Sequence, residues 1–274
     1  MTSVARTAQE PSATATATTP RRTATARMAA LGRAELTLLL RSRASLVNAV
    51  ILPSAVAFAM RGMVDGLDLE GTGLSVATVM LPAALANALF FAVYTNLVGV
   101  YVVRREGLVL KRLRTGELRD WEILAGGALP ALLLVFVQSV LLGAGMTVIL
   151  DANAPAAWHL VVAGLLIGMA MLVAAAALTA AFTRTAESAQ LTFLPFLLVT
   201  MAASGVFAPR ELLPDGAADV AAWLPFSPVM DLLRGGWTGD LGAVEQVRAT
   251  LVALAWTGVA VYGVQRRFRW EPRH

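Results

Sequence analysis

The amino-acid sequence predicts an all-α fold: a polytopic membrane protein with six transmembrane helices. Of its 274 residues, 57% are hydrophobic and 15% are charged, whereas a soluble domain is about 45–50% apolar and about 25% charged. The apolar residues form blocks long enough to cross a ~30 Å hydrocarbon core as helices, and they lack the alternation of barrel strands. This composition argues against a cytosolic enzyme. The absence of cysteine excludes disulfides and thiolate chemistry.

Two segments precede the first apolar block. Residues 1–27 are a low-complexity tract rich in Thr, Ala and Pro, for which we expect a disordered cytoplasmic tail. Residues 28–43 carry Arg33, Thr37 and Arg41 at intervals of four on a background rich in Leu and Ala. This periodicity is typical of an amphipathic helix in the membrane interface, and it fits a cytoplasmic extension of the first span equally well.

Each of the six apolar blocks is expected to form one spanning helix. The blocks run approximately over residues 44–60, 74–103, 123–150, 158–182, 189–208 and 249–264. The first and the last are short for a full crossing, so flanking residues or tilt would have to compensate. The second measures about 45 Å as a helix and should project beyond the bilayer. Gly164 and Gly168 form a GxxxG pattern in the fourth block, which is typical of close helix packing. The blocks define a membrane domain over residues 44–265, followed by a basic cytoplasmic tail over residues 266–274.

The basic residues predict the orientation of these helices. Eighteen of the 22 Lys and Arg residues lie in segments on the same side as the N-terminus, and four lie on the opposite side. Because cytoplasmic segments are enriched in Lys and Arg, we place both termini in the cytoplasm and the protein in the cell membrane. The pI of about 10.3 therefore reflects topology and a cytoplasmic docking surface, and no nucleic-acid partner is expected.

The sequence contains no recognisable catalytic or metal-binding motif. Its two histidines, His159 and His274, are far apart, and no hydrolase triad or His/Glu metal motif is present. A nucleotide-binding P-loop needs a glycine directly before its lysine, but Leu110 precedes Lys111, the only lysine of the chain. An ATP-driven function therefore requires another subunit.

A charged segment over residues 104–122 connects the second and third blocks. It mixes six basic and four acidic residues, and it breaks at Thr115 and Gly116 before a second short amphipathic piece. Arginines in such a loop can simply fix topology or bind anionic lipid. The interleaved acids and apolar side chains such as Leu110 and Trp121 favour a cytoplasmic element that docks a partner protein.

A second informative segment covers residues 209–240, before the last block. Its stretches of Leu, Ala and Trp are punctuated by Pro209, Pro214, Pro225 and Pro228. They are too apolar for a free loop and too short to span a membrane. We expect half-inserted re-entrant helices whose broken backbone is buried by protein. An outer interfacial loop without a role in transport is the alternative.

Short motifs stand near the ends of the predicted helices. The charged segment contains REG at 105–107, LKRLR at 110–114 and WEIL at 121–124. Farther along, SGVF at 204–207 precedes ELLP at 211–214, and LP at 224–225 precedes DLLR at 231–234. In this order among six helices, the motifs resemble those of permease subunits of type-2 ATP-binding-cassette (ABC-2) exporters, particularly the daunorubicin-resistance-like drug-exporter branch.

The resemblance implies a permease that works with a second permease copy, identical or paralogous, and with cytosolic ATPase subunits. ATP and Mg²⁺ would bind to the ATPase, and this chain would bind no cofactor. Membrane lipids are a further expected partner. Residues 28–43 would form the connecting helix, and residues 106–121 would carry the coupling helix. The residues implied in coupling are Arg105, Glu106, Lys111, Arg112, Arg114, Trp121 and Glu122. Those implied in the re-entrant segment are Glu211, Pro214, Pro225, Asp231 and Arg234.

Polar side chains within the spans are candidates for lining a substrate path, because polar groups in lipid are costly. Asn87, Phe90 and Tyr94 fall on one helical face, where they would form an amphipathic wall for a lipophilic substrate. The full set of candidates is Asn87, Phe90, Tyr94, Asn96, Gln138, Thr200 and Ser204. For any one of them, hydrogen bonding between neighbouring helices is the alternative role.

The function expected from these features is ATP-driven export of an amphiphilic drug, antibiotic or lipid-like molecule. A polysaccharide or lipid-linked glycan exporter is the alternative within the same class. An ion-coupled carrier normally needs carboxylates near the bilayer midplane, and none of the predicted spans has an acidic residue at its centre. An enzyme acting on lipids would need a cluster of His, Asp and Glu, for which Asp151 and His159 alone give little support.

Overall fold

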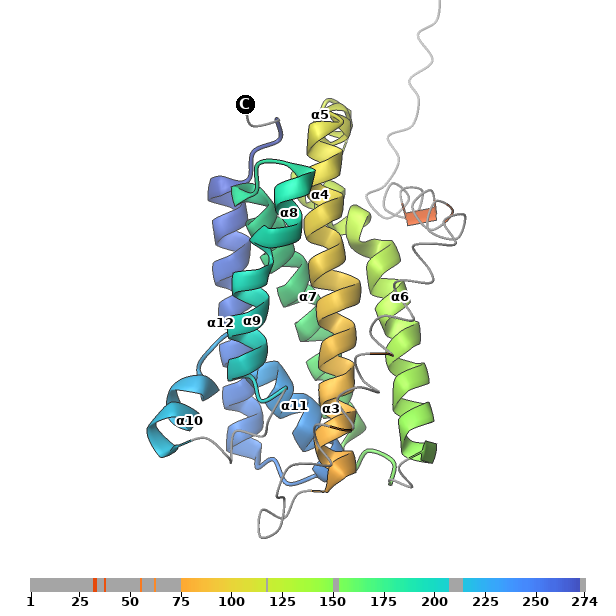
Figure 1. Ribbon diagram of the computed structural model, residues 1–274, viewed down its shortest axis with the longest axis vertical. Coiled ribbons are helices and arrows are strands. Elements are labelled where there is room, and N and C mark those ends of the chain that lie inside the picture. Colours follow the sequence, from red (N-terminus) through yellow and green to blue (C-terminus); the bar gives the residue numbers. More distant parts are fainter. Residues whose placement is uncertain are drawn as a thin grey trace, which may run out of the picture.

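The computed structural model describes residues 75–116, 118–149, 153–206 and 214–271, and a few isolated residues before them. Every regular element in these ranges is a helix, and the longer helices run side by side (Figure 1). The all-α class is confirmed for this part of the chain. The expected tail over residues 1–27, the connecting helix over residues 28–43 and the first span over residues 44–60 lie outside the described ranges.

The second predicted span forms one continuous helical rod. It consists of α3 (Val76–Ala88), the π-helical segment η1 (Leu89–Thr95) and α4 (Asn96–Glu106). Ser75 begins the rod as an N-cap, because its hydroxyl accepts a hydrogen bond from the N–H of Thr78 at 3.2 Å. The rod has 31 residues, so it is longer than a helix needs to cross a bilayer, as the sequence predicts.

A short helix separates this rod from the next span. Leu108 has a left-handed backbone (φ 58°). The chain changes direction there after α4, and α5 (Val109–Arg114) begins at the next residue. The next helix, α6 (Asp120–Ile149), has Asp120 and Glu122 in its first turn. The expectation of a separate amphipathic piece after Gly116 is wrong, since residues 120–122 already belong to α6. The carboxylates of this first turn are favourable there, because the N-terminal end of a helix is positive.

The fourth span, α7 (Trp158–Phe182), has the predicted bounds and packs closely against α11 (Ser227–Thr238). The GxxxG pattern explains the contact. A Cβ atom added at Gly164 would lie 3.1 Å from the side chain of Leu233, and one added at Gly168 would lie 3.0 Å from that of Val229. The prediction that these glycines serve helix packing is thus confirmed.

The last part of the chain differs most from the predicted blocks. The fifth block is divided at Phe193 into α8 (Ala186–Thr192) and α9 (Leu194–Ala203), because Pro195 cannot donate a backbone hydrogen bond and begins a new helix. Before the sixth block lie α10 (Asp215–Ala222) and α11. The final helix, α12 (Ala243–Arg267), is longer at both ends than the expected 249–264, so it needs no compensation for shortness.

Five helices of the described ranges are long and apolar enough to cross a membrane. They cover Val76–Glu106, Asp120–Gly145, Trp158–Phe182, Ala186–Ala203 and Ala243–Arg267, and each corresponds to one of the predicted blocks. Within the bundle, α7 contacts α11, α12, α4 and η1, and its Leu172 and Ala176 are fully buried. The core is thus built around α7, with α5 and the C-terminus at the same end of the molecule (Figure 1).

Candidate coupling surface at the charged end

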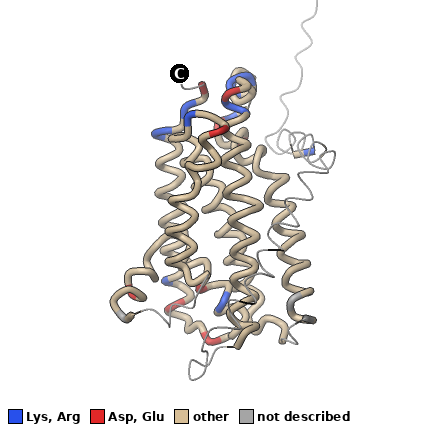
Figure 2. The backbone as a smooth tube through the Cα atoms, in the orientation of Figure 1, with Lys and Arg blue, Asp and Glu red and all other residues tan. Residues whose placement is uncertain are grey.

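Many of the charged residues lie at one end of the described bundle, as the blue and red segments of the backbone show (Figure 2). This end contains the α4–α5–α6 junction, the turn between α7 and α8, and the chain after α12. It is the end that the basic residues assign to the cytoplasm. The residues predicted to couple to an ATPase all belong to the α4–α5–α6 junction, where the structure divides them into buried and exposed groups.

Arg105 is buried inside this end of the bundle. Only 1% of its surface is exposed. Its guanidinium donates hydrogen bonds to the carbonyl oxygens of Ala180 at 2.7 Å, Thr183 at 2.6 Å and Arg184 at 3.2 Å. These carbonyls lie at the C-terminal end of α7, where a helix carries partial negative charge. Arg105 therefore joins α4 to the end of α7 from a buried position, and its role in coupling stays a prediction.

Its neighbour Glu106 makes a second contact to the same turn. The Oε1 atom accepts a hydrogen bond from the N–H of Ala186 at 3.2 Å, in the first turn of α8. A carboxylate at a helix N-terminus is favourable, because the helix dipole is positive there. Arg105 binds the end of α7 and Glu106 binds the start of α8. We call these two residues the clamp, because they attach the start of the charged segment to the turn between α7 and α8.

Trp121 and Glu122 have different surroundings although they are adjacent. Glu122 is fully buried and accepts a hydrogen bond from the N–H of Arg119 at 2.8 Å, which caps the start of α6. Trp121 is 54% exposed. The hydroxyl of Tyr101 on α4 donates to the carbonyl of Leu124 at 2.9 Å and ties α4 to α6. Glu122 thus supports the junction, whereas Trp121 stays available to a partner.

Several exposed cations of the junction lie on α5, and Arg119, just before α6, is exposed as well. Leu110 is buried and anchors the helix, while Lys111, Arg112 and Arg114 are exposed. Arg114 pairs with Asp120 at 3.0 Å, which connects α5 to the start of α6. The side chain of Arg112 has no hydrogen bond or ion pair with the described residues. Arg112 is therefore the α5 cation most available to a partner.

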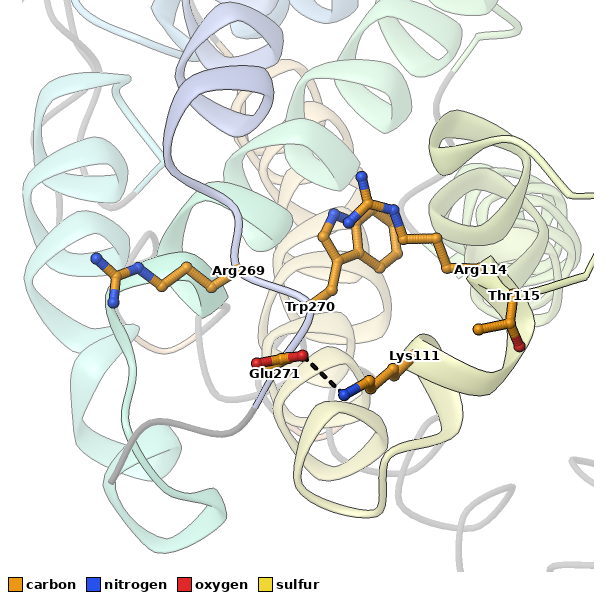
Figure 3. A pocket seen from close by; sticks show the side chains of 6 residues that line it. All are labelled: Lys111, Arg114, Thr115, Arg269, Trp270 and Glu271. Atoms are coloured by element: carbon orange, nitrogen blue, oxygen red, sulfur yellow. Dashed lines mark ion pairs between the residues drawn. The ribbon is translucent and has the colours of Figure 1, made fainter.

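The chain after α12 reaches across to α5. Lys111 Nζ lies 2.8 Å from Glu271 Oε1, and the Arg114 guanidinium lies 5.1 Å from the centre of the Trp270 ring (Figure 3). These residues, with Thr115 and Arg269, line an open pocket of about 580 Å³. The hydrogen bond and charge of Lys111 lower the pKa of Glu271, so its carboxylate stays ionised at neutral pH. This contact was not predicted from the sequence, although Trp270 and Glu271 are unusual in an otherwise basic tail.

A model of the ABC-2 type transporter family matches residues 27–237, most of the chain. The chain belongs to this family. No curated protein matches it. As an ABC-2 permease, the protein is the membrane component of an ABC transporter and not its ATPase, and membership implies an ATPase partner. The junction around α5 lies at the charged end of this permease (Figure 1).

The residues predicted to line a substrate path are scattered through the permease. Asn87, Phe90 and Tyr94 are fully buried within the protomer. Phe90 packs against Phe226, with ring centres 4.5 Å apart, and the Tyr94 hydroxyl lies 3.0 Å from the Thr179 hydroxyl oxygen. These side chains form no exposed wall in this conformation, because η1 packs against α7 and Phe226 packs against Phe90. A role in the substrate path stays a prediction.

The other path candidates differ in burial. Asn96 is exposed and donates to the carbonyl of Ala92 at 3.4 Å, while Thr200 and Ser204 are buried on or directly after α9. Gln138 on α6 is 3% exposed, and neither its Nε2 nor its Oε1 atom has a hydrogen-bond partner in the described part of the chain. A buried amide without partners is costly. Gln138 is thus the candidate with unused hydrogen-bonding capacity.

The segment predicted to be re-entrant contains α10 and α11 at the end of the bundle opposite α5 (Figure 1). Pro214 precedes α10 as its N-cap, and Pro225 lies in the turn before α11. Asp231 and Arg234 are on α11, which packs on α7 and α3. Glu211 lies outside the described residues. Insertion of these helices into the membrane stays a prediction.

Proposed function

We propose that the permease is the membrane half of an ATP-driven exporter for an amphiphilic drug, antibiotic or lipid-like molecule, powered by ATPase subunits on separate chains. The observation that carries this proposal is the family match combined with the exposed charged junction around α5. A helix anchored by Leu110 and Arg114, with Arg112 left exposed, is suited to receive a force from a partner. The clamp formed by Arg105 and Glu106 would pass that force to α7 and α8.

The described spans support ATP as the energy source over an ion gradient. Their acidic residues lie at the ends, such as Glu106 on the first rod, Asp120 on α6 and Glu245 on α12. An ion-coupled carrier usually needs ionisable groups or broken-helix sites near the midplane. The described spans offer no central carboxylate for such a site.

An amphiphilic substrate is supported by the sparse polar groups of the spans. The amide of Gln138, which has no partner within the described ranges, would give a polar group of the substrate a hydrogen-bonding position in largely apolar surroundings. Exposed apolar side chains on α12, such as Leu251 and Val259, would face lipid or a second permease copy. These features fit a lipophilic molecule with few hydrogen-bonding groups better than a long glycan.

Reconstitution with the partner ATPase tests this proposal. Permease and ATPase would be co-expressed, co-purified and placed in proteoliposomes, where uptake of a fluorescent amphiphilic drug into inside-out vesicles is followed after addition of ATP. We expect uptake that disappears when the phosphate-binding lysine of the ATPase is replaced. Uptake that persists in that variant would contradict ATP-driven export, and uptake of an oligosaccharide in place of the drug would contradict the proposed substrate class.

A further inference from the structure

We propose that the C-terminal tail, residues 268–271, is a second arm of the coupling element: it holds α5 in its orientation and links the movement of α5 to α12. This inference rests on the proposed function, because it concerns how the permease responds to its ATPase. Its main support is that two side-chain pairs join α5 to a segment about 160 residues later in the chain.

The tail is fixed to the bundle before it reaches α5. Phe268 ends α12, its N–H donates to the carbonyl of Val264 at 2.9 Å, and its ring packs against the hydrophobic core. Phe268 and Trp270 stack edge to face with ring centres 5.1 Å apart. Phe268 therefore fixes one end of the tail to α12 and the core, and Trp270 and Glu271 at the other end contact α5.

Trp270 and Glu271 contact two cations that are about one helical turn apart on α5. Glu271 pairs with Lys111, and Trp270 lies against Arg114, whereas Arg269 points away from both (Figure 3). Lys111 and Arg114 are three residues apart, so they lie on the same side of the helix. Two contacts on one side restrain rotation of α5 about its axis more than a single exposed ion pair would.

The exposure of these groups argues for orientation and against a role in folding. The side chains of Lys111 and Glu271 are 53% and 66% exposed, and exposed ion pairs contribute little to stability. Because Lys111 and Arg114 are occupied by the tail and by Asp120, Arg112 is left to face the ATPase. The tail thus determines which cation of α5 is presented.

A charge exchange tests this arrangement. Complexes of the permease with its ATPase would carry Glu271→Lys, Lys111→Glu, or both, and Trp270→Ala would remove the second contact. We expect each single change to lower substrate-stimulated ATP hydrolysis about two- to five-fold, the size typical of an exposed pair, while the ATPase still co-purifies. The double change should restore hydrolysis, because the ion pair reforms with reversed charges.

Glu187→Lys is the matched control. Glu187 is an exposed acid in the first turn of α8, next to Ala186, whose N–H bonds to Glu106, and it makes no ion pair with α5 or the tail in the described part of the chain. It should leave hydrolysis unchanged. Failure of the double change to restore hydrolysis would overturn the proposal. So would tighter ATPase binding by Trp270→Ala, since that would make the tail an inhibitory cover of α5.

A second measurement separates this proposal from the proposed function. The chain has no cysteine, so Lys111→Cys with Glu271→Cys can be joined selectively by a short bis-maleimide linker in the permease without its ATPase. We expect efficient crosslinking, and crosslinked complexes that still couple hydrolysis to substrate. Absence of crosslinking would overturn the tail contact alone, whereas a wild-type permease that binds no ATPase would overturn the proposed function.

Discussion

Arg105 illustrates how a charge in a loop motif can serve the fold. By sequence it is one of several basic residues in a hydrophilic segment, and its neighbours on α5 are exposed. In the structure its guanidinium satisfies three carbonyl oxygens around the end of α7. Sequence alone cannot separate these roles, because burial of Arg105 depends on where α7 ends relative to α4, which is a property of the packed bundle.

Replacement of Arg105 should therefore destabilise the permease. Arg105→Ala leaves buried carbonyls without donors, and we expect a loss of about 3 kcal/mol, because hydrogen bonds from charged groups are worth ~1.5–3 kcal/mol each. Arg105→Lys should be intermediate, since an ammonium lacks the planar fork of donors. Thermal unfolding in detergent measures the change. Arg112→Ala is the control, and equal melting temperatures for Arg105→Ala and Arg112→Ala would contradict the buried clamp.

Gln138 leads to the opposite expectation for stability. Because neither polar atom of its buried amide has a partner among the described residues, Gln138→Leu should leave stability unchanged or raise it by about 1 kcal/mol. Transport of an amphiphilic drug should fall if the amide contacts substrate. Drug uptake into proteoliposomes, with the exposed Gln190→Leu as control, measures this. Undiminished uptake would remove Gln138 from the substrate path.

At the scale of elements, the apolar blocks predicted the described spans well. The bounds of α7 matched because apolar composition begins and ends with the helix there. The division between α8 and α9 was not predicted, although Pro195 marks it, because the apolar run continues across the break. The extra turns of α12 were missed because they are polar, and a helix continues beyond the lipid whenever its backbone remains paired.

The contact between α7 and α11 gives a test of packing at this scale. A larger side chain at Gly168 would overlap Val229 and Leu89, whereas Gly258 on α12 has open space around its Cβ position. We expect Gly168→Leu to cost about 1–3 kcal/mol, the usual range for overpacking, and Gly258→Leu to have little effect. The yield and unfolding temperature of the purified permease report both. Similar behaviour of the two variants would contradict the close contact.

At the scale of the whole molecule, the distribution of charge gives the permease two unlike ends. Basic and acidic groups crowd the end with α5 and the tail, and the opposite end carries α10 and α11 (Figure 2). The arginines predict the overall orientation from composition and order alone, and this orientation stays a prediction. The tail contact was not, since it needs the three-dimensional meeting of α5 with residues beyond α12.

Cysteine labelling checks the predicted orientation. The wild-type chain has no cysteine, so Arg112→Cys and Asp240→Cys each offer a single thiol at opposite ends of the bundle. With the charged end in the cytoplasm, a membrane-impermeant maleimide added to intact cells should label position 240 and spare position 112. After the cells are opened, both should react. Labelling of position 112 in intact cells would contradict this orientation.

The proposed function requires that the exposed charge of α5 contacts the ATPase. The most direct test is co-purification of the ATPase with Arg112→Glu, compared with Arg267→Glu, which reverses an exposed charge at the same end of the bundle on α12. We expect both variants to insert and fold normally. Arg112→Glu should lose the ATPase and the stimulated hydrolysis, whereas Arg267→Glu should retain them. Full retention of ATPase binding and hydrolysis by Arg112→Glu would contradict it.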